Sequence, residues 1–364
     1  MMFIEEYIRS CKKVLEPYVD SYLTDLIEKR ASSDRELADL YETFKEAGRG
    51  GKCIRGSLVK LGYEIALGQP AGDEILPACA AFEILQTAIL GHDDVIDKSP
   101  LRRGKDSIWR ALMRRMEAWR RADDGHDGHF DDFHYGISQA ICLGDVGIFL
   151  ANRLVLESAF GADRKIEAMK VFLDVQLNTV DGEMLDVLMS HKKDYYDEEG
   201  ILKIANLKTA WYTIAGPLRL GAVLGGASPE LMDALRRYGV FLGMAFQLRD
   251  DILGIDATEA EIGKSNTSDI AEGKVTLLVY YAMKRATPVQ LEQLRRIYGS
   301  GTVSEADRLT VREIFDSTGA FTETTKKAEL FLSEATGIVD ELTQNAEQAA
   351  LLAQLGALMA QRKS

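Results

Sequence analysis

Residues 76–92, LPACAAFEILQTAILGH, carry apolar side chains on nearly every face of a helix. A helix of this kind is buried inside a protein, because a surface helix keeps one polar face. Residues 7–27 and 324–361 also repeat apolar side chains at helical spacing, and alternating strand patterns are almost absent from the chain. We therefore predict an all-α fold, a large bundle of roughly ten or more helices.

The composition is that of one large globular protein. The 364 residues are 46% hydrophobic and contain no linker rich in Pro, Gly or Ser, so we expect a single domain over residues 1–364. The net charge of −13 disfavours nucleic-acid binding but allows an anionic substrate in a local basic pocket.

The sequence also favours a cytoplasmic location. The N-terminus carries charges throughout and does not resemble a signal peptide. No run reaches the roughly 18 apolar residues that a membrane span needs. The four cysteines show no metal-ligand spacing, so we expect reduced thiols.

An acidic cluster ends the apolar stretch 76–92. Asp93 and Asp97 stand at i and i+4 and project together from a helix, with Asp94 beside them. Glu83 and Gln86 lie on the same face one or more turns earlier. Taken alone, this spacing is equally compatible with a helix end whose aspartates are simply hydrated.

A second acidic cluster favours a functional interpretation. Asp250 and Asp251 lie in another apolar helix, with Gln247 one turn earlier. If both acidic ends converge on one pocket, carboxylates about 4 Å apart repel by roughly 4 kcal/mol per pair. Such a pocket requires cations, and all-oxygen ligands suit Mg²⁺, which bridges carboxylates to substrate phosphates.

Basic residues near these clusters suggest that the substrates are diphosphates. Gly50 and Gly51 precede Lys52 and Arg55, an arrangement that can cradle a phosphate, although an ordinary helix start has the same composition. Further basic groups stand close to the acidic motifs: Arg102, Arg103, Lys208, Lys264 and Lys274.

Seven motifs in order resemble those of the trans-isoprenyl (polyprenyl) diphosphate synthases, which include the farnesyl and geranylgeranyl diphosphate synthases. The motifs are GGKCIR, HDDVIDKSPLRRG, HYGISQAICLGD, GEMLD, LKTAW, FQLRDD and GKSNTSDIAEGKVTLL. The resemblance covers almost the whole chain. It implies the isoprenoid synthase fold, an all-α bundle around a deep central cavity, usually as a homodimer. It also implies a prenyltransferase that joins isopentenyl diphosphate to an allylic diphosphate such as dimethylallyl, geranyl or farnesyl diphosphate.

The resemblance also implies a role for each motif residue. Three Mg²⁺ ions would be held by both aspartate motifs, which here are Asp93, Asp94, Asp97, Asp250 and Asp251, with Asp93, Asp97 and Asp250 as the metal ligands. The allylic diphosphate would be held by Arg102, Lys208 and Lys264, with Lys274 nearby. Isopentenyl diphosphate would be held by Lys52, Arg55, Gln86 and Arg103. Thr209 and Gln247 would turn oxygen dipoles to the allylic cation.

The chain departs from the family pattern at three positions. Glu183 stands where many members have Gln, and Gly56 stands where Pro often follows the arginine. The second motif is DDILG, so its fifth position is Gly254 rather than Asp. Asp256 is out of helical register with Asp250, and we do not expect it to be a ligand.

The product length depends on the residues that precede the first motif. In the family, an aromatic side chain four or five positions before the first aspartate stops the growth of short products. Here these positions hold Ile89 and Ala88, and one turn further back stand Ile84 and Leu85. Because none of them is aromatic, we expect a product longer than farnesyl, namely geranylgeranyl diphosphate.

Several alternatives remain. Longer polyprenyl products and farnesyl diphosphate stay open, because facing helices also shape the tunnel. A class I terpene cyclase would not need Lys52, Arg55 and Arg103. A non-catalytic subunit of a heteromeric synthase would be expected to lose metal ligands, whereas this chain keeps both aspartate pairs.

Overall fold

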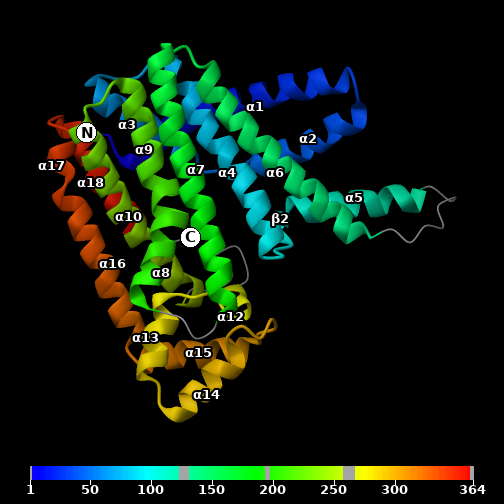
Figure 1. Cartoon of the computed structure of the whole chain (residues 1–364), viewed down its shortest axis with the longest axis vertical. Coiled ribbons are helices and arrows are strands. Elements are labelled where there is room, and N and C mark those ends of the chain that lie inside the picture. The colour runs from blue at the N-terminus through cyan, green and yellow to red at the C-terminus, as the bar shows by residue number, and fades with distance from the viewer. Residues whose placement is uncertain (1, 123–130, 193–196, 257–266, 361–364) are drawn as a thin grey trace. The chain divides into compact units, whose positions relative to one another are not determined.

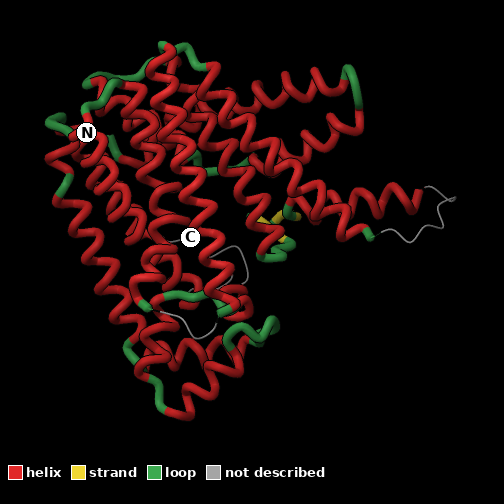
Figure 2. Tube along the Cα trace, in the orientation of Figure 1, coloured by secondary structure: helices red, strands yellow, loops and turns green. Residues whose placement is uncertain are grey.

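The computed structural model describes residues 2–122, 131–192, 197–256 and 267–360, and most of these residues are helical (Figure 1). The prediction of an all-α fold is confirmed. Within the described ranges the strands are limited to one antiparallel hairpin, β1 (Leu101–Arg102) and β2 (Lys105–Asp106), which Figure 2 shows in yellow.

The first half of the chain contains α1 (Ile4–Ala31), α2 (Arg35–Gly48), α3 (Ile54–Leu67), the short helix η1 (Asp73–Ile75), α4 (Leu76–Ile96), α5 (Ile108–Ala122), α6 (Asp132–Glu157) and α7 (Ala162–His191). The second half contains α8 (Glu198–Ile204), the π-helix η2 (Ala205–Ala215), α9 (Gly216–Gly225), α10 (Pro229–Asp256), α12 (Ser268–Glu272) and α13 (Leu277–Arg285). The chain continues with α14 (Pro288–Ile297), α15 (Glu305–Ser317), α16 (Ala320–Gly337), α17 (Val339–Leu342) and α18 (Ala346–Ala360).

The structure divides into two compact units. The N-terminal unit comprises residues 5–60 and 71–169, and the C-terminal unit comprises residues 1–4, 61–70 and 170–364. We describe each unit separately. The expectation of a single domain over 1–364 is not tested by this division and stays a prediction.

In the N-terminal unit, α4 is the central helix. It packs along α6 over much of its length and also contacts α2 and α5 (Figure 1). The stretch that is apolar on nearly every face is indeed buried, since ten residues of α4 are shielded from solvent on several sides of the helix. Phe82, Ile84 and Leu85 are among the largest fully buried side chains of the protein.

In the C-terminal unit, α10 has the central position. It contacts η2, α9 and α16 (Figure 1), and the hydroxyl of its Tyr238 donates to the carbonyl oxygen of Leu352 in α18 at 2.8 Å. The last turns of α10 join an apolar cluster with α12 to α15, in which Ile270, Leu278 and Phe315 are fully buried. This packing anchors the second acidic cluster.

Two helical stretches are long and apolar enough to cross a membrane when judged by length and composition alone, Asp73–Ile96 and Asp132–Glu157. Within the most apolar 18-residue segment of each stretch, 56% and 44% of the residues, respectively, are buried inside the structure. Core helices of globular proteins pass the same test, so these two stretches are weak evidence for a span. The expectations of no membrane span and of a cytoplasmic location stay predictions.

Candidate active site

The first acidic cluster forms the end of α4. The N–H of Asp97 donates to the carbonyl oxygen of Asp93 at 2.8 Å, and Asp97 is the C-terminal cap of the helix. Asp94 is only 2% exposed. The indole nitrogen of Trp109 donates to its carbonyl oxygen at 3.1 Å, which ties the start of α5 to this helix end.

The β-hairpin brings Arg102 back onto these carboxylates. Nε of Arg102 donates to Oδ1 of Asp94 at 2.9 Å, and its Nη2 donates to Oδ1 of Asp94 at 2.5 Å and to Oδ2 of Asp93 at 2.8 Å. Burial alone would lower the pKa of Arg102, but the hydrogen bonds and charges of the two aspartates outweigh it and raise the pKa. The guanidinium group therefore stays charged, and it offsets two carboxylates of which one is buried.

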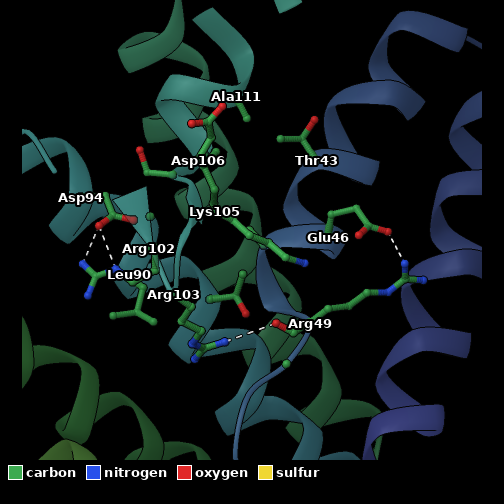
Figure 3. Close-up of a pocket in the computed structure, with 16 residues that line it drawn as sticks. Thr43, Glu46, Arg49, Leu90, Asp94, Arg102, Arg103, Lys105, Asp106 and Ala111 are labelled. Carbon is green, nitrogen blue, oxygen red and sulfur yellow. Dashed lines mark hydrogen bonds and ion pairs between the residues drawn. The ribbon is translucent and has the colours of Figure 1, made fainter. Parts of the chain in front are cut away.

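The turn of the hairpin explains why Arg102 and Arg103 point to different partners. Arg103 and Gly104 have φ angles of 53° and 73°, the left-handed pair that a tight two-residue hairpin turn requires. Arg103 reaches the carbonyl oxygen of Arg49 with its Nη1 at 3.4 Å. Both arginines line a pocket of about 330 Å³ between α2, α4, α5 and the hairpin, together with Lys105 and Asp94 (Figure 3).

Two of the residues predicted to hold isopentenyl diphosphate are hydrogen-bonded between α3 and α4, and a third lies in the loop before α3. Nη1 of Arg55, in the first turn of α3, donates to Oε1 of Gln86 at 2.7 Å. Lys52 is exposed in the loop before α3, between Gly50 and Cys53, whose φ angles of 82° and 54° set the path of the chain.

Glu83 belongs to the same region, although it was not predicted to have a role in the site. Its Oε1 accepts a hydrogen bond from the N–H of Gly56 at 2.8 Å. Burial raises the pKa of Glu83, while the Gly56 bond and the charge of Arg55 act against that rise. Gly56 is also tightly enclosed, since a Cβ there would lie 2.4 Å from Cδ2 of Leu15. The departure from Pro at this position therefore has a structural reason, because Pro has no N–H to donate.

In the C-terminal unit, the π-helix η2 carries Lys208 and Thr209. Single π-helical turns are frequent at functional sites. Nζ of Lys208 lies 2.8 Å from Oδ2 of Asp186 and 2.7 Å from Oε2 of Glu183, both on α7. Close approach of the two helices depends on Gly182, because a Cβ there would lie 2.4 Å from the backbone nitrogen of Lys208. Glu183, one of the three departures from the family pattern, thus pairs directly with Lys208.

A chain of hydrogen bonds links η2 to the second acidic cluster. Oγ1 of Thr209 donates to Oε1 of Gln247 at 2.6 Å, and Nε2 of Gln247 donates to Oδ1 of Asp251 at 2.7 Å. Burial raises the pKa of Asp251 to about 7, and the charges of Asp269 and Asp250 add to this rise, whereas the charge of Lys274 and the hydrogen bond from Gln247 oppose it. A cation nearby would favour the ionised form of Asp251.

The predicted site residues thus fall into two groups, one in each unit. Lys274 belongs to the C-terminal group through its charge on Asp251. Lys264 lies outside the described residues. The convergence of the two acidic clusters on one pocket stays a prediction.

The residues predicted to set the product length lie along α4, and their role stays a prediction. Ile84, Leu85 and Ala88 are all buried, and Ile89 is partly exposed. A Cβ on Gly147 of α6 would lie 2.7 Å from Cβ of Ala88 and 2.6 Å from Cζ of Phe44 of α2. The two positions before the motif are not aromatic, but Ala88 and the ring of Phe44 both lie next to Gly147.

The acidic residues fit a magnesium ion that is coordinated partly by the protein and partly by a substrate. Among the residues that the structure describes, no group of three or more His, Cys, Asp and Glu side chains could hold a metal ion by itself. Mg²⁺ is commonly held by one or two carboxylates together with water and substrate phosphates. Asp93 with Asp94, and Asp250 with Asp251, meet that smaller requirement.

A sequence model described as Polyprenyl synthetase matches residues 36–315. The chain belongs to the polyprenyl synthetase family. It is 34% identical over 274 residues, 74% of each chain, to a short chain isoprenyl diphosphate synthase of Methanothermobacter thermautotrophicus. It is 29% identical over 281 residues to the octaprenyl diphosphate synthase of Escherichia coli, covering 76% of this chain and 75% of that one.

Solved structures agree with this polyprenyl synthetase assignment. A crystal structure of a geranylgeranyl pyrophosphate synthase from Corynebacterium glutamicum, complexed with isoprenyl diphosphate and magnesium, has a TM-score of 0.87. It is 29% identical and covers 97% of this chain and 99% of its own. The protein is therefore a prenyltransferase with the isoprenoid synthase fold, from a magnesium-dependent family that uses isopentenyl and allylic diphosphates.

Gly56→Pro should destabilise this polyprenyl synthetase, although proline is normally tolerated in the first turn of a helix. The substitution removes the donor to half-buried Glu83 and places ring atoms against Leu15, so we expect a loss of roughly 2–4 kcal/mol in the free energy of unfolding. Urea denaturation measures it. Gly161→Ala is the control, since a Cβ at Gly161 meets nothing within 4 Å. Equal stability of both variants would contradict the role of the Gly56 bond.

Proposed function

We propose that this protein condenses isopentenyl diphosphate with allylic diphosphates and makes mainly geranylgeranyl diphosphate. The observation that carries the proposal is the contact of Arg102 with both Asp93 and Asp94. It places a basic group suited to a diphosphate directly on the acidic pair suited to metal ions. Relatives that make geranylgeranyl, geranylfarnesyl and octaprenyl diphosphates share the family, so the product length rests on local residues.

In the proposed reaction, the aspartates and the basic groups divide the work on the allylic substrate. Asp93, Asp97 and Asp250 would hold three magnesium ions, with Asp94 and Asp251 in support. When bound, magnesium supplies positive charge to the leaving diphosphate. Arg102 and Lys208, which are paired with carboxylates in the structure, would turn toward the diphosphate as those carboxylates gain other counter-charges. Lys264 and Lys274 would add to the same charge.

The allylic carbon that becomes cationic needs dipoles rather than full charges. The hydroxyl of Thr209 and the amide oxygen of Gln247 are hydrogen-bonded to each other, which fixes both oxygens in place. We propose that they face the allylic cation. Lys52, Arg55, Gln86 and Arg103 would hold isopentenyl diphosphate, and the bond between Arg55 and Gln86 supports a shared site.

Product analysis with isopentenyl diphosphate and each allylic primer tests this function. We expect elongated diphosphates in the wild type, and a cyclic hydrocarbon as the product would overturn the proposal. Asp93→Asn and Asp250→Asn should each lower kcat by roughly 100-fold or more, because they remove charge that acts in the transition state. Asp256→Asn is the matched control, since Asp256 pairs with Arg312 at the surface and should leave the rate unchanged.

The product length should depend on Ile89. This residue stands four positions before Asp93, on the same face of α4, and is aliphatic and partly exposed. Ile89→Phe should shift the main product toward farnesyl diphosphate, since a ring fills space that about one isoprene unit would use. Ile89→Leu keeps the volume and should keep the length. Chromatography of the dephosphorylated products decides, and an unchanged length in Ile89→Phe would contradict this assignment. Ala88→Phe, in contrast, would overpack the contact with Phe44 and Gly147.

We further propose a homodimer, supported by unusually exposed apolar side chains on two long helices. On α6, Phe149 is 70% exposed and Leu156 is 50% exposed. On α7, Leu177 and Met184 are similarly exposed. Each pair is spaced seven residues apart and so lies on one face of its own helix, and exposed apolar faces can mark interaction sites in globular proteins.

Phe149→Asp should convert the proposed dimer to a monomer, because a buried charge without a partner opposes association. Sedimentation velocity measures the change in mass. Leu330→Asp provides the control, since Leu330 is 52% exposed on α16 and should not alter the assembly. A monomeric wild type would rule the proposal out.

A further inference from the structure

The pocket between α2, α4, α5 and the hairpin contains groups to which the proposed reaction gives no role. Its volume of about 330 Å³ lies in the range of small-ligand sites. The set predicted to hold isopentenyl diphosphate contributes Arg103 to this pocket. The other members of that set, Lys52, Arg55 and Gln86, are not part of the described lining. The pocket therefore differs from the predicted isopentenyl diphosphate site, although the two share one arginine.

The side chain of Ser107 lines the pocket with a buried hydroxyl group. Ser107 is only 2% exposed, and its Oγ has no hydrogen-bond partner in the part of the chain that the structure describes. Its backbone is fixed, because its N–H donates to the carbonyl oxygen of Pro100 at 3.0 Å and its own carbonyl oxygen accepts from the N–H of Ala111 at 2.9 Å. A buried hydroxyl without a partner is unfavourable, and a ligand that accepts a hydrogen bond from it would satisfy the group.

The start of α5 adds a second preference for an anion. Ser107 immediately precedes this helix, where a serine usually accepts a hydrogen bond from an N–H of the first turn. Its Oγ makes no such bond, and the first turn of α5 contains no acidic residue. The first N–H groups of a helix have no partner within the helix and favour negative charge. Ile108 and Ala111 line the pocket, so this end of α5 borders it.

Two positive charges of the pocket are not neutralised by the protein. Each acidic side chain of the described lining already pairs with a basic group: Glu46 with Arg49, Asp94 with Arg102, and Asp106 with Arg110 and Arg114. Among the described residues, Arg103 and Lys105 form no ion pair. Lys105 stands opposite Arg102 in the hairpin, and its side chain extends toward α2 (Figure 3).

We propose that this pocket is an auxiliary subsite for a diphosphate group, which Arg103, Lys105 and the hydroxyl of Ser107 hold at the start of α5. Charged donors of this kind suit phosphate oxygens. An occupied subsite would compete with isopentenyl diphosphate for the guanidinium group of Arg103. Only this competition rests on the proposed function. Inorganic pyrophosphate, which prenyl transfer releases, and a prenyl diphosphate present the same chemical group to the pocket.

Calorimetric titration of the full-length protein with inorganic pyrophosphate tests the subsite. A metal chelator is present, so that the aspartate motifs do not hold the anion through metal ions. All titrations use the Arg55→Ala background, which weakens the predicted isopentenyl diphosphate site without changing the pocket lining. The added substitutions are Lys105→Ala, Lys105→Arg, Ser107→Ala and, as a control, Lys13→Ala at an exposed position of α1. The melting temperature without ligand shows whether each variant is folded.

Lys105→Ala and Ser107→Ala should each raise the Kd of pyrophosphate by roughly 10-fold, because each removes a donor to a charged ligand. Lys105→Arg and Lys13→Ala should bind as the background does. Ser107→Ala should keep or raise the melting temperature without ligand, since it removes a buried hydroxyl that has no partner. A lower melting temperature would assign the hydroxyl to the stability of the fold and contradict its role in the subsite.

Parallel titrations with isopentenyl diphosphate and orthophosphate identify the ligand. If Lys105→Ala weakens isopentenyl diphosphate more than pyrophosphate, the subsite takes a prenyl diphosphate, and the reverse order indicates the free anion. Orthophosphate that binds as tightly as pyrophosphate would contradict the diphosphate class. The proposal is also overturned if the background protein binds no pyrophosphate, or if Lys105→Ala and Ser107→Ala both bind it as the background does.

The competition is measured separately, by condensation assays with Mg²⁺ in the otherwise wild-type protein. Added pyrophosphate should raise the KM for isopentenyl diphosphate less in Lys105→Ala than in the wild type, whereas kcat and KM without pyrophosphate should be unchanged. An equal rise in both proteins would rule out competition through this subsite. A failure of the proposed function would instead appear as a protein that binds pyrophosphate in a Lys105-dependent manner but elongates no substrate.

Discussion

Carboxylates placed in an apolar helical bundle must be neutralised, and this requirement shapes each part of the candidate site. Asp94 is almost completely buried, and it is accompanied by the guanidinium of Arg102. Asp186 is also buried and receives the ammonium group of Lys208. Uncompensated charges at such positions would cost several kcal/mol each. Under the proposed function, the same pairs would provide the cations and anions that a diphosphate and its metal ions need, so stability and function would depend on one set of charges.

Irregular backbone brings these partners together. The hairpin turn at Arg103 and Gly104 uses two left-handed residues, and it directs Arg102 back to the end of α4. The π-helix η2 carries Lys208, whose side chain reaches α7, and Thr209, whose side chain reaches α10. Gly182 lets α7 approach the backbone of Lys208. Regular helices supply the rigid support, whereas these local deviations set the positions of the polar groups.

The departures from the family pattern become understandable through neighbouring residues. Gly56 keeps an N–H that donates to half-buried Glu83, and Glu183 adds a second carboxylate to Lys208. Gly254 leaves room for the carboxylate of Asp269. In each case a residue distant in sequence makes the unusual residue compatible with the site. A family motif records residue types at single positions, but the physical requirement applies to the whole set of contacting groups.

Helical periodicity and motif order were sufficient to predict the all-α fold, the buried helix at 76–92 and the family, because these features are local patterns of residue type. The roles of the polar residues of the candidate site stay predictions. The hairpin was missed because its strands have two residues each, too few for an alternating pattern. The pairing of Arg102 with Asp94, the contact of Phe44 with the space beside Ala88, and the position of Asp269 next to Gly254 were decided only by the tertiary structure. These contacts join separate segments, and their distances depend on how the chain packs rather than on the spacing of residues along it.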